Sequence, residues 1–187
     1  MILKLMGHDP AFRNWGMATA LYDTKLNHLS FTGLDIAQSK IDKSVSTRKN
    51  SKDVSVAEFT VRKIMPHIKD TQISFIEMPV GSQYPNYMLS YGYCCGIAGT
   101  LRAQGNSIIE VHSQDIKEIL TGSRTASKDD VIIACMKDYP HLDWPMQTKK
   151  GVTTYIKGRA EHMADAVGAV RAGLVTKEFQ DLLSVIG

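Results

Sequence analysis

Acidic side chains stand at the ends of two apolar segments of this sequence. The segment "ILKLMGHD" closes on Asp9, and the segment "ISFIE" closes on Glu77. With the two-residue period of a β-strand, each carboxylate continues the apolar face of its own segment. A carboxylate in such a place is costly to desolvate unless a positive charge meets it, and two of them together repel each other. A divalent cation would remove both costs, so the pattern predicts metal chemistry.

A third acidic group lies in "GRAEHMADAVGAV", which has the periodicity of a helix. Asp165 lies off the apolar stripe, and both His162 and Glu161 share its face because they precede it by three and four residues. Two side chains at this spacing can meet one ion. Each acidic pattern alone is also typical of a solvated turn, strand end or polar helix face. Only their joint occurrence favours a metal site.

The rest of the sequence predicts the elements that position these groups. Early hairpin strands followed by strand-helix-strand crossovers predict an α/β fold with a mixed five-stranded sheet flanked by helices. We expect loops at residues 39–52 and 139–158. The expected strands are 2–8, 16–24, 26–36, 71–78 and 107–111; the expected helices are 54–68, 84–103, 113–120, 127–139, 159–174 and 176–186.

Composition limits the class of protein. The chain has 187 residues, of which 43% are hydrophobic and 22% charged, as in an ordinary globular domain. A net charge of +3 permits nucleic acid as a partner. Three cysteines without a CxxC pattern argue against a disulfide framework and a thiolate zinc site, which favours a reducing compartment. The N-terminal residues lack the features of a signal peptide, and no apolar run is typical of a membrane span.

Four motifs together resemble one family. "GHDPAFRNWGMA", "FIEMPVG", "HSQDIKEILTGSRTASKDDV" and "HMADAVGAV" occur in the order and at the separations of the RuvC family of Holliday-junction resolvases, in a divergent form of the kind found in bacteriophages. The resemblance extends from residue 2 to about residue 174. It implies a ribonuclease-H-like fold, with residues 1–187 as a single RuvC-like nuclease domain. It also implies a homodimer that cuts four-way DNA junctions by metal-dependent hydrolysis with paired symmetric nicks.

The resemblance also implies roles for named residues. Asp9, Glu77 and Asp165 match metal ligands, with Asp9 bridging two ions. His162 occupies the remaining ligand position, and Glu161 beside it is the alternate ligand. Oxygen-rich ligation favours Mg²⁺, which Mn²⁺ can replace, and we expect two ions per active site. The resemblance places two lysines near the scissile phosphate, Lys117 and Lys128. We expect a cytoplasmic protein of a prokaryote or phage-infected host, associated with the nucleoid.

Basic residues supply the expected DNA contacts. Residues 39–70 hold eight Lys and Arg against four acids, and residues 149–159 hold four and no acid. Such side chains bind phosphates without reading sequence, although for any single lysine a solvated loop charge is the ordinary alternative. The candidates are Arg13, Arg48, Lys49, Lys52, Lys117, Arg124, Lys128, Lys149 and Lys150.

Several departures from the family keep other functions open. His8 replaces an aliphatic residue, and strand alternation turns its side chain away from Asp9. "MPVG" follows Glu77 where the family often has an aromatic wedge, so Val80 or Tyr84 must serve or the wedge is absent. The alternative function is a related nuclease that acts on flaps, branched replication intermediates or RNA–DNA hybrids. Two further alternatives are a junction-binding protein without catalysis and an actin-like ATPase. The ATPase would need glycine-rich phosphate loops, which this sequence does not show.

Glycines recur in the segment 84–103, at positions 92, 96 and 99. Glycine inside a helix costs about 0.5–1 kcal/mol relative to alanine, so a packing reason is expected. In the resembled family the corresponding helix lies at the dimer interface. Close packing within one subunit would require the same glycines.

Overall fold

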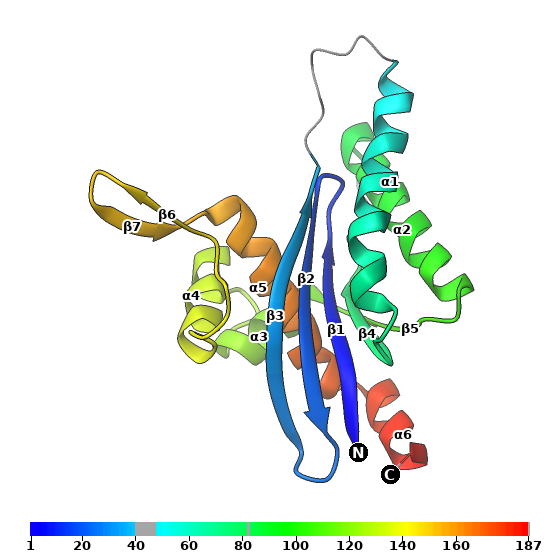
Figure 1. Ribbon diagram of the computed structural model, residues 1–187, viewed down its shortest axis with the longest axis vertical. Helices are drawn as coiled ribbons and strands as arrows, with labels where there is room; N and C mark the ends of the chain where they lie inside the picture. The colour runs from blue at the N-terminus through cyan, green and yellow to red at the C-terminus, as the bar shows by residue number, and fades with distance from the viewer. Residues whose placement is uncertain (40–47, 82, 187) are drawn as a thin grey trace.

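A mixed five-stranded sheet forms the centre of the computed structural model, which describes residues 1–39, 48–81 and 83–186 (Figure 1). The strand order is β3-β2-β1-β4-β5, with the first three strands antiparallel and with β4 and β5 parallel to β1. The predicted sheet is therefore confirmed. The strands are β1 (Ile2–Pro10), β2 (Asn14–Asp23), β3 (His28–Gln38), β4 (Ile73–Glu77) and β5 (Ser107–Val111).

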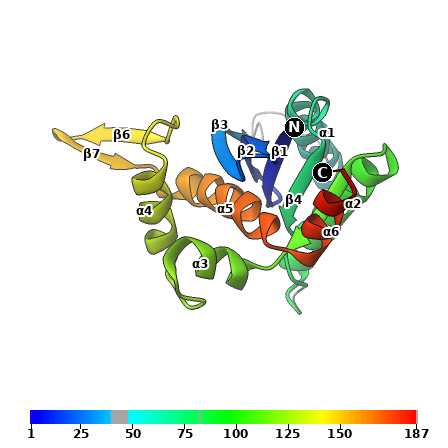
Figure 2. The ribbon, with the colours of Figure 1, turned by 90° about the horizontal axis from the view of Figure 1, so that it is seen from below.

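Helices cover both faces of this sheet, and α5 and α1 lie on opposite sides of it (Figure 2). One face packs against α5 (Lys157–Leu174), with α3 (Ser113–Thr121) and α4 (Lys128–Asp138) beside that helix. The other face packs against α1 (Lys49–Ile68) and α2 (Pro85–Ala103). A short α6 (Lys177–Ile186) follows α5. Within the described residues, no helix has both the length and the apolar character needed to cross a bilayer.

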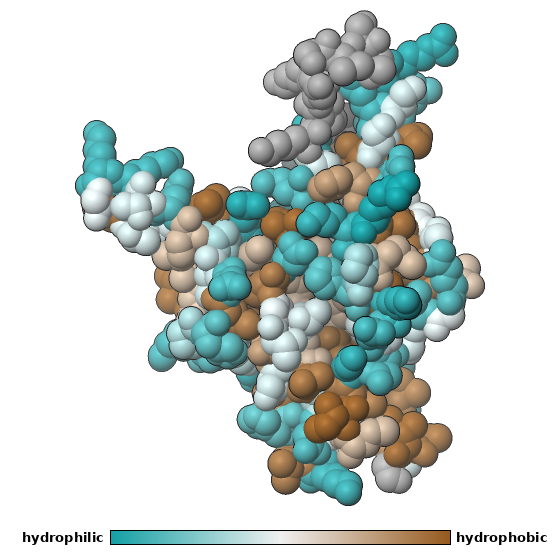
Figure 3. All heavy atoms as spheres, in the orientation of Figure 1, coloured by the Kyte–Doolittle hydropathy of each residue, from teal (hydrophilic) through white to brown (hydrophobic). Residues whose placement is uncertain are grey.

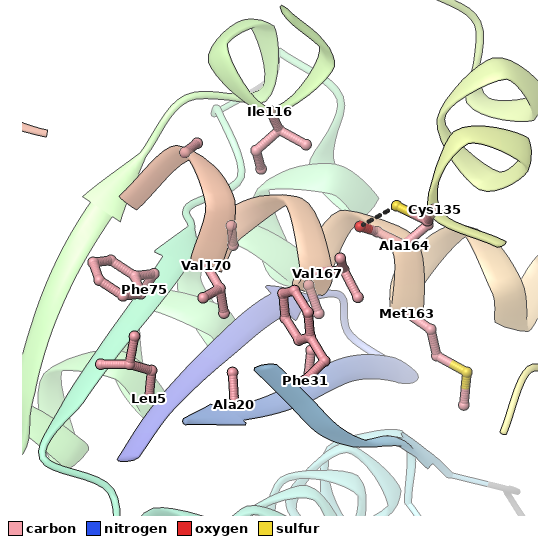
Figure 4. Close-up of a cluster of buried hydrophobic side chains, with 14 of the residues drawn as sticks. Leu5, Ala20, Phe31, Phe75, Ile116, Cys135, Met163, Ala164, Val167 and Val170 are labelled. Carbon is pink, nitrogen blue, oxygen red and sulfur yellow. Dashed lines mark hydrogen bonds between the residues drawn. The ribbon is translucent and has the colours of Figure 1, made fainter. Parts of the chain in front are cut away.

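Strand alternation divides the interior into two cores. Leu5 and Phe75 face α5, whereas Met6 and Ile76 face α1 and α2, as the period of two requires. Figure 4 shows Leu5 and Phe75 packed beneath the valines of α5. Burial of both faces explains why β1 and β4 are mostly apolar and why their carboxylates come only at their C-terminal ends.

Two glycines let α5 lie directly on the sheet. A Cβ atom at Gly7 would overlap the backbone oxygen of Ala166, and one at Gly16 would overlap that of His162. Both strand positions therefore need a residue without a side chain. This close approach brings the middle of α5 to the end of β1, where the acidic residues gather.

Caps set the helix boundaries near these residues. Gly122 adopts the left-handed conformation at φ 76° and ends α3. Ser127 and Asp130 form a reciprocal capping box that starts α4. These two caps fix the turn between the helices that carry Lys117 and Lys128.

Two predicted loops need correction. Helix α1 begins at Lys49, so part of the expected loop at 39–52 is helical, and residues 40–47 lie outside the described residues. The expected loop at 139–158 contains a two-stranded hairpin, β6 (Met146–Lys149) and β7 (Val152–Tyr155). Helix α5 begins at Lys157, two residues earlier than expected. In each case the segment is polar, and its structure has no buried apolar stripe that a pattern could reveal.

Candidate active site

The ends of β1 and β4 place two carboxylates side by side. These strands are parallel neighbours with Gly7 opposite Phe75, so their C-terminal ends meet at one edge of the sheet. Asp9 and Glu77 both lie on the α5 side, as predicted. Asp165 reaches them from α5, and one carboxylate oxygen from each of the three residues lies within 4.8 Å of the others. Among the described residues, this is the group whose geometry could hold a metal ion.

His162 lies against Asp9 rather than beside all three carboxylates. Its Nδ1 atom is 2.5 Å from Oδ2 of Asp9, and both side chains are largely buried. The contact depends on Gly16, whose missing side chain leaves room for the His162 backbone. Burial by itself lowers the pKa of His162, but the hydrogen bond and the charge of Asp9 outweigh burial and raise it. His162 is therefore placed to orient Asp9.

Glu161 points to a different partner. Its Oε2 atom accepts a hydrogen bond from Nζ of Lys128 at 2.9 Å, and it is absent from the three-carboxylate group. Burial lowers the pKa of Lys128, and the contact with Glu161 raises it above its ordinary value. Sequence spacing could not distinguish the roles of Glu161 and His162, because both share a helix face with Asp165. Their contacts in the fold differ, since Glu161 contacts Lys128 and His162 contacts Asp9.

A cavity of about 240 Å³ opens over the carboxylates. Helix α3 contributes Ser113 and Lys117 to its wall, and α4 contributes Lys128 and Val131. All six predicted catalytic residues line this one cavity, which is walled by Asp9, Glu77, Ser113, Lys117, Lys128, Val131, His162 and Asp165. Sequence reasoning missed Ser113. Its position one helical turn before Lys117, at the start of α3, is the signal that could have found it.

Burial and repulsion between the carboxylates raise the pKa values of two of them. Burial, then the charges of Asp9 and Asp165, raise the pKa of Glu77 to about 8. Burial and the charge of Asp9 raise the pKa of Asp165 to about 7. Glu77 and Asp165 therefore hold protons near neutral pH unless a cation replaces those protons. The donor set therefore fits a divalent cation with oxygen ligands.

His8 belongs to the other face of the sheet, as strand alternation predicts. It is fully buried, and its Nδ1 accepts a hydrogen bond from the indole nitrogen of Trp15 at 3.1 Å. Burial and the nearby His67 lower the pKa of His8 to about 3, so the ring is neutral. His8 thus supports the core beneath Asp9 and does not enter the carboxylate cluster.

The predicted DNA-binding residues occupy several surfaces. Arg13 is exposed in the β1–β2 loop, and a second set surrounds the start of α1: Arg48, Lys49 and Lys52. Lys149 and Lys150 are exposed at the end of the β6–β7 hairpin. Arg124 is instead held by Asp115 and Glu118 at 3.1 and 2.6 Å, in the turn between α3 and α4.

Comparisons with known proteins show which fold this chain shares. No protein-family model and no curated protein sequence matches the chain. Among solved structures, T. thermophilus RuvC in complex with a Holliday junction substrate matches with a TM-score of 0.58 at 11% identity, over 92% of both chains. This chain has the RuvC-like, ribonuclease-H-like fold.

A viral protein gives a second match. Fowlpox virus resolvase, in complex with its substrate Holliday junction DNA, matches with a TM-score of 0.55 at 12% identity, over 93% of this chain and 100% of that chain. Another crystal structure of the fowlpox virus Holliday junction resolvase matches with a TM-score of 0.52 at 14% identity, over 93% of this chain and 97% of that chain. The architecture expected from the four motifs is therefore confirmed at the level of fold.

Proposed function

We propose that this protein is a structure-selective DNA endonuclease that resolves four-way junctions by metal-dependent phosphodiester hydrolysis, with paired symmetric nicks. The observation that carries the proposal is the meeting of Asp9, Glu77 and Asp165 in one cavity beside Lys117 and Lys128. The shared fold supports it, since the similar structures include resolvases bound to Holliday junctions. Residues 1–187 would act as one nuclease domain.

Asp9, Glu77 and Asp165 would hold the metal, with Asp9 shared between two Mg²⁺ ions that Mn²⁺ can replace. When bound, such ions lower the pKa of a water molecule and stabilise the charge on the leaving oxygen. The raised pKa values of Glu77 and Asp165 support a cation here, because it would take the place of the protons that the acids otherwise keep. His162, whose Nδ1 faces Asp9, would fix the orientation of that shared carboxylate.

The two lysines of the cavity would act on the scissile phosphate. Lys117 and Lys128 line the same cavity as the carboxylates, and a phosphate bound in that cavity would meet both lysines. Positive charge placed in advance stabilises the negative charge that grows during in-line attack. Glu161 holds Lys128 in place through its 2.9 Å contact. Ser113, on the same wall, offers a hydroxyl donor to a phosphate oxygen.

Two symmetric cuts call for two active sites, so we propose a homodimer. Helix α2 supports this assignment. A Cβ atom at Gly92, Gly96 or Gly99 would meet no atom of the described residues within 4 Å, so close packing within that part of the subunit does not explain these glycines. They lie on an exposed stretch that also carries Tyr87, Met88 and Leu89. A second copy of the chain packed against this stretch of α2 would account for the glycines.

A related nuclease specific for flaps, branched replication intermediates or hybrids is the second candidate. It is favoured by the segment after Glu77, where exposed Val80 stands in place of an aromatic wedge. One experiment separates the two: a four-way junction, a flap, an RNA–DNA hybrid and a plain duplex are each incubated with the protein in Mg²⁺ or in EDTA. Symmetric Mg²⁺-dependent nicks confined to the junction support the proposal. Equal cutting of the flap or the hybrid supports the alternative.

A further inference from the structure

A short hairpin extends from the end of the molecule that holds the active site. Strands β6 and β7 pair antiparallel, with Lys149 opposite Val152 at the tip, and project beyond α4 and the start of α5 (Figure 1). Lys150 and Gly151 form the two-residue turn with φ values of 51° and 78°. Positive φ at both positions is the mark of a tight turn that matches the strand twist. We call residues 146–155 the basic hairpin.

Within the hairpin, only Tyr155 at its base packs against a core of the described residues. Most of its side chains are exposed, and Val152 remains 63% exposed. Figure 3 shows it as a mostly hydrophilic extension at one side of the molecule. An isolated two-stranded hairpin is only marginally stable in water, so a tight turn and an anchored base are needed to keep it folded. The fold gains little burial from the rest of the hairpin, which points to a role in binding.

The base of the hairpin is anchored next to the cavity. The hydroxyl of Tyr155 donates to Oδ1 of Asp129 at 2.8 Å, and Lys157 contacts Oδ2 of the same carboxylate at 2.6 Å. The backbone N–H of Ile156 donates to the oxygen of Pro145 at 2.7 Å. Asp129 directly follows Lys128, which lines the cavity. The hairpin is therefore fixed in position relative to the carboxylates.

The charge of this region has one sign. Residues 144–160 include four Lys and Arg and no Asp or Glu. By strand alternation, Gln147, Lys149 and Thr154 share one face of the hairpin, and all three can donate hydrogen bonds to phosphate. The first turn of α5 lacks an acid, and its Lys157 is paired with Asp129 of α4, so Lys149 and Lys150 at the tip, both exposed, offer the charge of this region to a partner.

We propose that the basic hairpin binds the phosphate backbone of the duplex arm that leaves the active site. The proposal rests on the nuclease function above and adds a surface that fixes how the arm lies. About eight helical residues from Asp165 to Lys157 span roughly 12 Å. The seven residues from Lys157 to Lys150 add at most about 23 Å. The hairpin tip thus reaches at most about 35 Å from the carboxylates, or roughly ten base pairs at 3.4 Å per step.

The test compares Lys149→Ala/Lys150→Ala with a matched control, Lys25→Ala/Lys177→Ala. The control also removes two exposed lysines, from the β2–β3 turn and from α6, both at the opposite end of the molecule (Figure 1). Junction binding is measured in EDTA across a range of salt. Each lost phosphate contact makes the slope of log K against log salt less steep by about 0.9. The slope of the hairpin variant should therefore be less steep than that of the wild type by about 1.8. The control should keep the wild-type slope.

Neutral methylphosphonates locate the contact. Placed in turn at positions up to roughly ten base pairs from the cut, they should at the contacted position weaken binding by the wild type several-fold and leave the hairpin variant unchanged, because the two changes remove one interaction. Equal weakening of both proteins, or a hairpin variant with the wild-type slope, would overturn the inference. Thermal melting shows whether the variant is folded, and a wild type that neither binds nor cuts junctions would reject the nuclease function instead.

Discussion

Asp9 and His162 are 153 residues apart in the sequence, and their Oδ2 and Nδ1 atoms lie 2.5 Å apart. This contact joins the end of the central strand to the middle of the helix that crosses it. Asp9 also belongs to the three-carboxylate group, so the contact fixes one oxygen of a proposed metal ligand while the other stays available. Most of the predictions below test consequences of this arrangement.

Replacing His162 with asparagine should lower activity without unfolding the protein. Asparagine can still contact Asp9 but has a shorter reach, so the carboxylate would lose its fixed orientation. Loss of a partner that orients a metal ligand typically costs about 10–100-fold in metal affinity or activity. Initial nicking rates across a Mg²⁺ titration would show the loss as a higher metal requirement. A variant with the wild-type Mg²⁺ dependence would contradict an orienting role.

The metal-free protein should lose stability as the pH rises from about 6 to about 8.5. Folding raises the pKa of Glu77 to about 8 and that of Asp165 to about 7, so the folded state binds protons that the unfolded state has released. Stability from a raised pKa is complete below the unfolded value and is lost as the pH rises through the folded value. The raised pKa of His162 acts in the same direction. The loss should be on the order of 1–3 kcal/mol.

Thermal melting in EDTA and in Mg²⁺ over this pH range provides the measurement. Bound Mg²⁺ should flatten the pH dependence, since a cation replaces the protons, and Glu77→Gln should flatten it in EDTA. If neither Mg²⁺ nor Glu77→Gln changed the pH dependence of stability, groups elsewhere in the protein would be its cause.

Glu161→Gln should leave the affinity for metal close to that of the wild type. Glu161 contacts Lys128 and lies outside the carboxylate group, so its loss should mainly change the position of that lysine. We expect a lower nicking rate at saturating Mg²⁺ with little change in the Mg²⁺ concentration at half-maximal rate. The matched comparison is Asp165→Asn, which should shift the Mg²⁺ requirement strongly. An equal shift in both variants would identify Glu161 as a ligand.

The sequence predicts the sheet and the carboxylates well because both rest on local patterns. Asp9 and Glu77 end apolar strand faces, and Asp165 sits at a helical spacing that needs no knowledge of partners. The assignment of Glu161 and His162 required the contacts with Lys128 and Asp9, which lie far away in the sequence. The β6–β7 hairpin was missed because its strands bury no apolar face, and its turn uses a lysine at positive φ.

Gly16→Val should destabilise the protein and reduce cutting together. A side chain at this position would overlap the His162 backbone, so α5 must move away from Asp9. Overpacking of this kind costs about 1–3 kcal/mol. Gly158→Ala, in the helix that Gly16 contacts, is the control, since its Cβ would meet no atom of the described residues within 4 Å, and it should not lower the free energy of unfolding. Denaturant unfolding gives both values, and a neutral Gly16→Val would contradict the close packing of α5.

The most direct test of the central claim compares the wild type with Asp9→Asn on a four-way junction extruded from a supercoiled plasmid. Binding is measured in parallel in EDTA. With Mg²⁺, the wild type should convert the plasmid to a linear product through paired nicks across the junction. Asp9→Asn should bind the junction and leave the plasmid uncut. Cutting by Asp9→Asn at the wild-type rate, or binding without cutting by the wild type, would contradict catalysis by the carboxylate cluster.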